Sequence, residues 1–471
     1  MAPMTEGHVA GLSEQARQAF AARLARELGD GQALTGAPCA AYAIQGRTPV
    51  VVARPAQMEA LGLALRLAAE AGAALAPWGA GSRMALGFPP QRLDLVVSLE
   101  RLNRVIAYDP ADLTITVEAG MAHAELDRIL AASGQALPLD PPLPARATIG
   151  GTLATGLAGL RRALYGSPRE VTLGMSGFDA AGQPLKAGGA VVKNATGYGM
   201  TRLYIGSLGT LCVFGAASFK LTPLPEAEAT VLAAAPGPGE LLAATQAVNA
   251  LAVRPSAVVA LHVAALPELA RLTPGHERRQ LLAIRLPGNA AAVRRGGAEA
   301  TIALRQAGAT PLLTLDGASH DAFWASANDF AALRTHPREA LARLSALPTE
   351  MGQALDHAER LAREQRLRLL WLTDLLSGAL WLRLSAADAA DAAAAGESAD
   401  DDAAFAAALR ATLDALIRRW RVVTTLACPP AIKPALALWG ADPASLDLMR
   451  EVKRRFDPER RLNPGRYVAG L

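Results

Sequence analysis

The apolar residues in the first half of the chain follow two patterns, a helical repeat and short continuous runs. From Ser13 to Leu28 apolar side chains recur at intervals of about four residues, which is the spacing of an amphipathic helix. The run Val50–Val52 predicts a buried strand, and the periodicity of 56–71 predicts a helix after it. A second apolar run at 74–76 completes a predicted βαβ unit behind an N-terminal helix.

Shorter apolar runs follow this unit and predict further strands with one more helix. The strands are expected at 93–97, 105–108 and 114–119, with two short ones ending near Leu221, and the helix at 122–132. Pro223 and Pro225 then interrupt the pattern, which predicts that the first region ends there.

The second half of the chain alternates strands and helices more regularly. Strands are predicted at 229–235, 257–263, 281–286 and 310–315, with helices at 241–251 and 290–307. Two consecutive βαβ units of this kind resemble a ferredoxin-like half. The remainder adds helices and strands such as 380–384, and the acidic, alanine-rich stretch 386–404 is predicted to be a mobile insertion.

Composition and charge narrow the class of protein. A chain of 471 residues can hold at least two hydrophobic cores, and with 51% apolar but only 4% aromatic residues those cores must be built from small aliphatic side chains. Lysine and arginine (47) exceed aspartate and glutamate (43) by only four, with no basic tract, so nucleic acid is not an expected partner. Three widely spaced cysteines provide neither a disulfide framework nor ligands for zinc or an iron–sulfur cluster.

The same residues bear on location. The first twenty residues are acidic and polar where a signal peptide would be apolar, and no apolar run reaches membrane-spanning length. We therefore expect a cytoplasmic protein, whose contact with the inner face of the cell membrane would be peripheral and made through partners.

The most informative polar segment is the loop Pro77–Met84, which follows an apolar strand. Gly79 and Gly81 allow positive φ angles and leave backbone N–H groups open to a phosphate, and Ser82 adds a hydroxyl donor. A Rossmann dinucleotide site would need a third glycine where Met84 stands and a helix where the next strand is predicted. Backbone donors, without a helix dipole, are thus expected to hold the anion, although a Gly-x-Gly pair alone also fits an ordinary turn.

Three later segments strengthen the phosphate interpretation. Together with Pro77–Ser82, the segments Thr148–Gly151, Val191–Tyr198 and Gly206–Leu211 resemble, in order and spacing, the FAD-binding domain of the vanillyl-alcohol oxidase and p-cresol methylhydroxylase type. Within that superfamily the sequence is most similar to the smaller, FAD-binding subunit of bacterial glycolate oxidase. The closing segment Lys453–Arg466 is similar to the C-terminus of that family.

The resemblance implies an α+β fold, with a two-subdomain FAD-binding domain of p-cresol methylhydroxylase type followed by a ferredoxin-like α+β cap domain. It divides the chain into a helical extension at 1–44, the FAD-binding domain at 45–225, the cap at 226–445 and a segment at 446–471 that returns to the FAD-binding domain.

The resemblance also implies the cofactor site. The loop Pro77–Ser82 would hold the FAD pyrophosphate, and the segment from Thr148 would close over it. The segment Gly206–Val213 would line the cofactor, with the Val213 backbone facing the adenine. The cofactor-binding residues expected on this basis are Pro77, Trp78, Gly79, Ala80, Gly81, Ser82, Pro141, Thr148, Gly150, Gly151, Thr152, Thr155, Lys193, Gly206, Ser207, Gly209, Thr210, Val213 and Asn463.

Three of these expectations depend on chemistry that can be stated separately. Some family members bind flavin covalently through a histidine or cysteine, often in the first loop, and this loop has neither, so FAD is expected to be non-covalent. Lys193 would stabilise the negative charge of reduced flavin near N1, unless it is simply a surface lysine. Asn463 would approach the flavin, or else belong to a plain Asn-Pro-Gly turn.

The sequence identifies no catalytic residue. The seven histidines are scattered, with no two at metal-ligand spacing in one element, so no metal site is expected, although His320 with Asp321 and His357 with Asp356 are conceivable pairs. Gly199 stands where the family has the aspartate of a Gly-Tyr-Asp pattern. The tryptophans at positions 324, 371, 381 and 439 are expected to anchor the second core rather than to stack on flavin.

Three functions remain open at this stage. The leading one is the FAD-binding subunit of a glycolate oxidase complex, in which a sister flavin subunit oxidises glycolate to glyoxylate and an iron–sulfur subunit passes electrons to quinone. A second is a self-sufficient FAD-linked dehydrogenase of a 2-hydroxy acid, with Arg83 or Arg146 holding the substrate carboxylate. The third is a structural subunit with a vestigial flavin site.

Overall fold

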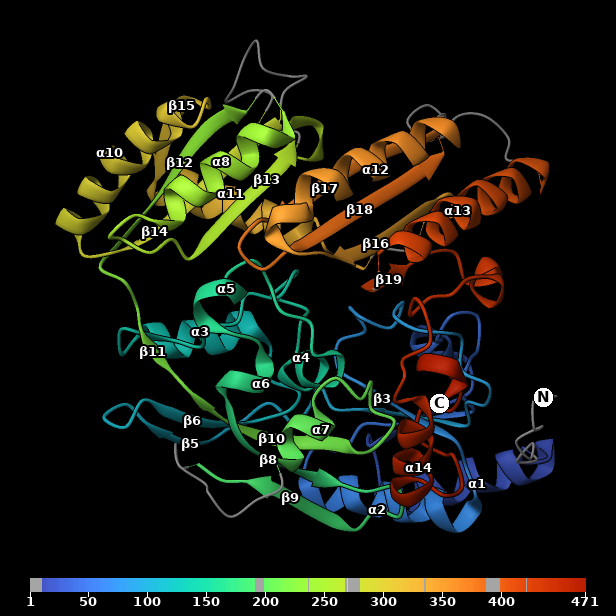
Figure 1. The fold of residues 1–471 in the computed structure, drawn as a ribbon. Helices are drawn as coiled ribbons and strands as arrows, with labels where there is room; N and C mark the ends of the chain where they lie inside the picture. The colour runs from blue at the N-terminus through green and yellow to red at the C-terminus, as the bar shows by residue number, and fades with distance from the viewer. Residues whose placement is uncertain are drawn as a thin grey trace.

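The protein consists of a lower half, formed by the N-terminal part of the chain and its C-terminal end, and a cap above it, as the computed structural model shows (Figure 1). The structure describes residues 11–190, 199–235, 237–266, 269, 280–333, 336–386, 399–420 and 422–471. The whole third segment of the resemblance, Val191–Tyr198 with Lys193, lies outside these residues. Among the residues described, no helix has both the length and the apolar character that crossing a bilayer requires.

The N-terminal helix is part of the first subdomain. Helix α1 (Glu14–Leu28) begins at Ser13, whose hydroxyl accepts a hydrogen bond from the Ala16 N–H, and its apolar face packs on α2 (Met58–Ala71). Strand β1 (Ala33–Thr35) then adds to the edge of a four-stranded sheet ordered β1-β2-β4-β3. Strands β2 (Val51–Ala53), β3 (Leu75–Trp78) and β4 (Leu95–Ser98) of that sheet run parallel, so the predicted βαβ unit is present.

The second subdomain is a five-stranded antiparallel sheet with short helices. Its strand order is β5-β6-β10-β8-β9, and the two short strands expected before Leu221 are one eight-residue strand, β10 (Val213–Lys220). The other elements are β5 (Val105–Asp109), β6 (Thr114–Glu118), β7 (Gln135–Ala136), β8 (Thr172–Phe178), β9 (Pro184–Gly188), β11 (Thr222–Pro223), α3 (His123–Ala131), α4 (Ile149–Thr155), α5 (Arg162–Tyr165), α6 (Pro168–Val171) and α7 (Met200–Tyr204).

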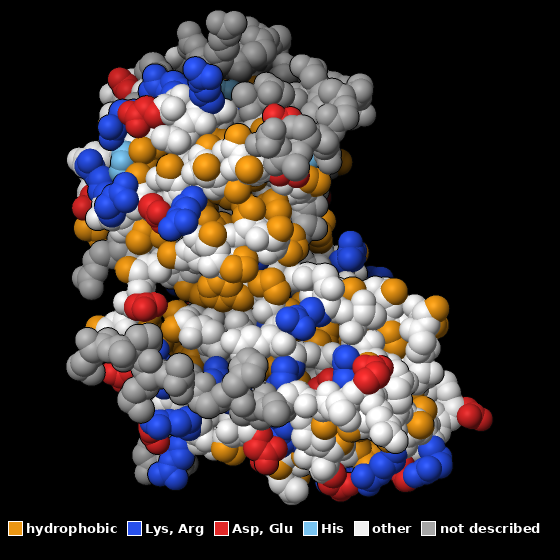
Figure 2. Space-filling model, turned by 90° about the vertical axis from the view of Figure 1, so that its right-hand side faces the viewer, with side chains coloured by type: hydrophobic (Ala, Val, Ile, Leu, Met, Phe, Trp, Pro, Cys, Tyr) orange, Lys and Arg blue, Asp and Glu red, His pale blue; other side chains and the backbone are white. Residues whose placement is uncertain are grey.

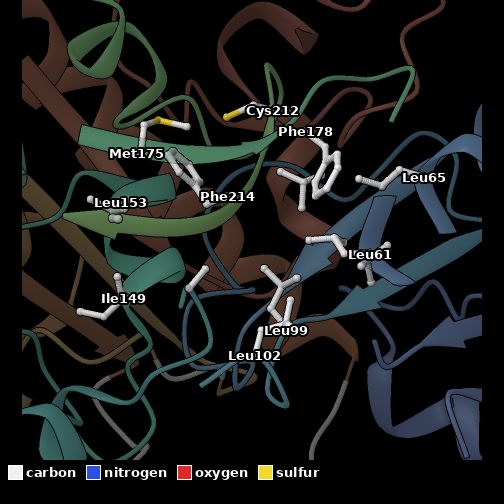
Figure 3. Packing of buried hydrophobic residues seen from close by; sticks show 14 of the residues in the cluster. Leu61, Leu65, Leu99, Leu102, Ile149, Leu153, Met175, Phe178, Cys212 and Phe214 are labelled. Atoms are coloured by element: carbon white, nitrogen blue, oxygen red, sulfur yellow. The ribbon is translucent and has the colours of Figure 1, made fainter. Parts of the chain in front are cut away.

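A shared apolar core joins the two subdomains. Leu61 and Leu65 of α2 lie near Phe178 of β8, while Ile149 and Leu153 of α4 lie on the other side of the same cluster (Figure 3). These side chains are at most 7% exposed. The core therefore fixes the loop after β3 relative to α4, which matters for the site described below.

The cap contains two ferredoxin-like units in tandem. The first is β12 (Ala227–Ala235), α8 (Pro238–Asn249), β13 (Ala257–His262), β14 (Gln280–Gly288), α10 (Ala290–Gln306) and β15 (Thr310–Asp316). The second is β16 (Glu339–Ser345), α12 (Met351–Glu364), β17 (Leu367–Asp374), β18 (Ala379–Ala386), α13 (Ala399–Arg419) and β19 (Val422–Ala427). Each unit places its fourth strand beside its first, then the third and the second, in one sheet ordered β15-β12-β14-β13-β17-β18-β16-β19.

The two units meet where β13 pairs antiparallel with β17. The sequence indicated the first unit but not the second repeat. It also placed a mobile insertion at 386–404; residues 387–398 of this stretch lie outside those that the structure describes, while Ala386 ends β18 and the residues from Ala399 onward form the start of α13. Residues 399–404 are helical because alanine favours helices and aspartate is stabilising near a helix N-terminus.

The two faces of the cap sheet pack against different partners. Along β12, Val231, Ala233 and Ala235 face the helices α8, α10, α12 and α13, while Leu232 and Ala234 belong to a cluster with Leu86 and Leu208 of the lower half. Helix α11 (Gly317–Asp329) contributes to this second cluster as well. Figure 2 shows apolar side chains gathered where the molecule narrows between the two halves.

The end of the chain runs back to the lower half. Helix α14 (Leu446–Phe456) is followed by residues that bridge to β3, where the Leu75 N–H donates to the Arg461 carbonyl and the Asn463 N–H donates to the Leu75 carbonyl. Short 3-10 helices complete the fold at Ala37–Tyr42, Val263–Ala265, Pro348–Glu350, Pro430–Ala435 and Val468–Gly470.

Candidate functional site

A cavity lies where four separate segments of the lower half converge. The loop after β3 forms one wall, and α4 forms the opposite one. The backbone at Leu208 and Gly209 and the closing segment at Asn463 and Arg466 complete the lining. All of these segments belong to the lower half, and the described residues of the cap do not line the cavity.

Glycines in this loop are required by the close approach of neighbouring groups. A Cβ atom on Gly79 would lie 2.2 Å from the Thr148 hydroxyl oxygen, far inside van der Waals contact. Gly81 has φ of +75°, and a Cβ there would meet the Trp78 ring at 2.5 Å. Any side chain at either position would therefore move the wall of the cavity.

The opposite wall begins with a capped helix. The Thr148 hydroxyl accepts a hydrogen bond from the Gly151 N–H at 3.2 Å, which starts α4 at Ile149. The sequence predicted that no helix N-terminus would contribute to the anion site, because a strand follows the first loop. That strand is β4, as expected, but the second glycine segment is helical and its first turn lines the cavity.

The cavity carries positive charge from two buried arginines. Arg466 donates to the carbonyls of Met84 and Leu86 at 2.8 Å each, and also to Asn463. Arg83 donates from Nη1 to the Thr155 hydroxyl at 2.6 Å. Burial lowers the pKa of each guanidinium to about 10, so both remain charged at neutral pH.

A buried histidine lies behind α4. His123 shares a hydrogen bond of 2.9 Å with the Thr152 hydroxyl, and burial together with the Arg83 charge lowers its pKa to about 3. The imidazole is therefore neutral at physiological pH and adds no charge to the cavity.

The closing segment is anchored by side chains that contact the cavity wall. The Asn463 amide donates to the Leu208 carbonyl at 2.7 Å, and the residue adopts a φ of +45°. From the cap, the Lys433 ammonium donates to the carbonyls of Ala85 and Gly87. The loop that follows Arg83 is thus held by cations from two distant parts of the chain.

The structure brings together about half of the residues that the sequence selected. Those that line the cavity are Pro77, Gly79, Ala80, Gly81, Ser82, Thr148, Gly151, Thr155, Gly209 and Asn463. Four further lining residues were not among the expected cofactor contacts: Met84, Ala154, Leu208 and Arg466. Arg83, the fifth, entered the sequence argument only as a substrate-binding residue.

The other selected residues have different positions. The Trp78 ring packs against Tyr42, and Thr152 contacts His123 behind α4. Gly150 lies close to Ala119, and Pro141 is buried in the loop before α4. Gly206, Ser207 and Thr210 line a second groove beside α14, and Val213 begins strand β10 opposite Phe178. These residues do not line the cavity itself.

The conspicuous polar cluster of the cap is an internal network. Glu228 accepts two hydrogen bonds from Arg285, at 2.9 and 2.7 Å, and lies 3.7 Å from His320 Nε2. Thr230 shares a hydrogen bond with His320 Nδ1 and accepts one from Trp324. His320 is thus placed toward Glu228 rather than used with its neighbour Asp321.

His357 and three tryptophans of the cap take part in its packing. His357 accepts a hydrogen bond from Trp420, and Trp324, Trp371 and Trp381 are buried in the two clusters of the cap. Across the residues that the structure describes, no three histidine, cysteine, aspartate or glutamate side chains gather as a metal site would require.

Comparison with known families identifies the cofactor. Residues 49–188 match the family described as FAD binding domain, and residues 434–467 match the C-terminal domain of FAD linked oxidases. The two matches contain both main walls of the cavity and its closing segment. The described lining of the cavity has a glycine cradle and two arginines but no carboxylate, which fits the doubly charged diphosphate of FAD.

Several curated proteins share part of the sequence. Glycolate oxidase subunit GlcE of Escherichia coli (strain K12) is 40% identical over 150 residues, which are 32% of this chain and 42% of that protein. Glycolate oxidase subunit GlcD of Bacillus subtilis (strain 168) is 32% identical over 185 residues, 39% of each chain. D-2-hydroxyglutarate dehydrogenase of Xanthomonas citri pv. viticola is 33% identical over 188 residues, 40% of each chain. The chain thus spans about two fifths of the length of these relatives.

Solved structures agree over nearly the whole chain. Substrate-bound p-cresol methylhydroxylase superposes with a TM-score of 0.75 at 15% identity, covering 97% of both chains. The 4-ethylphenol oxidase from Gulosibacter chungangensis gives a TM-score of 0.74 at 14% identity, covering 98% of both chains. The chain therefore has the α+β fold of the p-cresol methylhydroxylase type, and its cofactor is FAD.

Proposed function

We propose that this chain is an FAD-dependent oxidoreductase subunit, namely the FAD-binding subunit of a glycolate oxidase complex. The observation that carries the proposal is the cofactor cavity, with its glycine cradle and its two buried arginines. The choice of glycolate oxidase is supported by the 40% identity with the GlcE subunit, which is higher than the 32% and 33% shared with GlcD and D-2-hydroxyglutarate dehydrogenase.

The residues of the cavity divide the work of holding the cofactor. The backbone of Gly79 to Ser82 and the hydroxyl of Thr148 would bind the diphosphate, while Asn463 and Arg466 keep the closing segment in place. FAD, when bound, supplies a two-electron acceptor for the oxidation of a hydroxy acid. Neither histidine nor cysteine is present in the first loop, which supports a non-covalent cofactor.

In the proposed complex this chain works beside two partners. A sister flavin subunit would oxidise glycolate to glyoxylate, and an iron–sulfur subunit would carry the electrons toward quinone. The three buried, separate cysteines are consistent with clusters held elsewhere. The chain itself would be cytoplasmic, and any contact with the membrane would be made through the partners.

The decisive experiment compares the chain alone with the complex. The chain should be purified with FAD and mixed anaerobically with glycolate, and the loss of flavin absorbance followed. We expect no bleaching within enzymatic turnover times, but rapid bleaching when the native complex, isolated through a tag on this chain, is used instead. Turnover by the isolated chain at the rate of the complex would contradict the proposed division of labour.

A second candidate is a self-sufficient dehydrogenase of a 2-hydroxy acid, which the similarity to D-2-hydroxyglutarate dehydrogenase favours. Under this alternative one acid in a panel of 2-hydroxy acids should bleach the flavin of the isolated chain. Acid precipitation of the same sample tests the attachment of the cofactor, because non-covalent FAD stays in the supernatant.

A further inference from the structure

The buried guanidinium of Arg83 has only part of its hydrogen-bonding capacity satisfied. The side chain is 8% exposed, Nη1 donates to the Thr155 hydroxyl, and the buried Nη2 has no hydrogen-bond partner. A buried cation without a counter-ion is strongly unfavourable, because its desolvation is not offset by an attractive charge. Arg83 therefore needs a partner that the residues described in the structure do not supply.

The lining of the cavity shows what kind of partner this is. It contains two arginines and, among the residues that the structure describes, neither aspartate nor glutamate. The second arginine, Arg466, already donates to carbonyls on several residues, so its N–H groups are occupied within the protein. The cavity thus carries a positive charge that a dianionic ligand would neutralise.

The position of Arg83 favours the cofactor over a substrate carboxylate. The residue directly follows the Gly79–Ser82 cradle, and its Nη1 is oriented by Thr155 on the opposite wall. The Thr155 hydroxyl in turn donates to the Gly151 carbonyl at 2.8 Å, so the guanidinium is fixed across the cavity and not directed at the cap. A substrate carboxylate would have to enter between the same two walls.

We propose that Arg83 is the counter-ion of the FAD diphosphate: Thr155 holds Nη1, and Nη2 donates to a phosphate oxygen. This chain would thereby add a charged hydrogen bond to the backbone donors of the glycine loop. The assignment goes beyond the proposed function, because it concerns the cofactor and holds whichever substrate or partner the protein has.

A distinctive consequence is that the arginine destabilises the empty protein and stabilises the loaded one. Arg83→Met keeps a flexible, unbranched side chain, although a shorter one, and removes the charge that lacks a partner. The apo-protein of this variant should melt at the same temperature as the wild type or higher, whereas the increase in melting temperature on adding FAD should shrink. A residue with a purely structural role would lower the melting temperature of the apo-protein.

The affinity measurement uses FAD fluorescence quenching and competition by ADP. Charge-assisted hydrogen bonds of this kind suggest that Arg83→Met weakens FAD roughly 10- to 100-fold, with Arg83→Lys recovering part of the loss. ADP, which carries the diphosphate without the flavin, should lose affinity by a similar factor, while adenosine should be unaffected. Arg294→Met, which removes an exposed arginine from α10, serves as the charge-matched control and should leave all affinities unchanged.

Three results would overturn the assignment. The first is an unchanged Kd for FAD and ADP in Arg83→Met. The second is a lower melting temperature of the apo-protein, including a variant that does not fold, which would make Arg83 structural. The third is a shift of flavin potential, or of KM for a hydroxy acid, with the FAD affinity intact, which would place the guanidinium at the flavin ring or the substrate.

Discussion

Two arginines of the cap and the two arginines of the cofactor cavity are held in opposite ways. In the cap, Arg285 forms a two-pronged ion pair with Glu228, and Arg383 pairs with Glu339. In the cavity, Arg466 donates to backbone carbonyls and Arg83 to a single hydroxyl. The charges of these cap arginines are thus neutralised by carboxylates of the cap, whereas the cavity keeps a net positive charge that a ligand would neutralise.

One buried cation of the lower half is paired with a carboxylate, as the arginines of the cap are. It therefore tests whether the stability of a buried cation depends on its ion pair or on the half of the molecule in which it lies. Lys453 of α14 donates to the Asp457 carboxylate at 2.6 Å, and the Asp457 side chain is fully buried. Asp457 also accepts from the N–H groups of Arg461 and Leu462. This carboxylate therefore holds the turn that carries the chain back to β3.

The largest effect is expected for Asp457→Asn. The change leaves the Lys453 ammonium buried without its counter-ion, and breaking a buried pair in this way costs about 3–5 kcal/mol. Urea unfolding of the apo-protein should show this loss. Asp447→Asn on the same helix is the control, because that side chain is 97% exposed and its removal should cost less than about 0.5 kcal/mol. Equal losses in the two variants would show that pairing is not what matters.

A smaller effect, specific to the cofactor, is expected for Gly79→Ala. The added methyl group would lie 2.2 Å from the Thr148 hydroxyl, so the loop and α4 must separate. A strain of about 1–3 kcal/mol corresponds to a loss of FAD affinity of roughly 10- to 100-fold. Gly239→Ala in α8, where nothing lies within 4 Å of the new Cβ, should leave the affinity unchanged. Tight FAD binding by Gly79→Ala would remove the loop from the site.

These two halves also differ in how far the sequence predicts them. The first loop could be found from sequence because Gly79 and Gly81 mark a backbone that comes close to another group. Arg466 and Leu208 could not, because they reach the cavity only through contacts between segments more than 250 positions apart, such as Asn463 with Leu208. The sequence did contain one signal for Arg466, because it stands three positions after Asn463, which was selected as a cofactor-binding residue, in the same closing segment.

In the cap the sequence predicted the fold less completely, for a different reason. The first ferredoxin-like unit has separate strands and helices, so its periodicity is easily seen. In the second unit, α13 begins inside an alanine-rich acidic stretch, and β17 and β18 form one hairpin with buried residues on both faces. From sequence alone, neither the alanine-rich stretch nor the hairpin distinguishes a second ferredoxin-like unit from irregular structure. The second unit becomes evident only when β13 is seen to pair with β17.

The dependence of stability on pH tests the ion pair of Glu228 in the cap. Burial alone would raise the pKa of Glu228, but His320 and Arg285 lower it to about 2 from an ordinary 4.5. A depressed carboxyl pKa contributes stability that is complete above about pH 4.5 and is lost as the pH falls toward 2. With allowance for partial exposure, the contribution is about 2 kcal/mol.

Glu228→Gln should therefore be less stable than the wild type at pH 7, and the difference should narrow as the pH falls toward 3. Urea unfolding at both pH values measures it. The exposed Glu226 provides the control, since Glu226→Gln should follow the wild-type profile. A difference between Glu228→Gln and the wild type that does not change with pH would mean that the ion pair is not its source.

The smallest effect is expected at the open edge of the cap, where Arg338 meets the start of α13. Its Nε donates to Asp402 at 2.9 Å, but the Asp402 side chain is 53% exposed. Solvent screens such a pair, so Asp402→Ala should cost about 0.5–1 kcal/mol in urea unfolding and leave FAD affinity unchanged. Salt should reduce the difference further, whereas it should hardly affect the loss in Asp457→Asn. A loss of 3 kcal/mol or more at Asp402 would mean that exposed pairs hold the cap as firmly as buried ones, and the contrast between cap and cavity would no longer rest on burial.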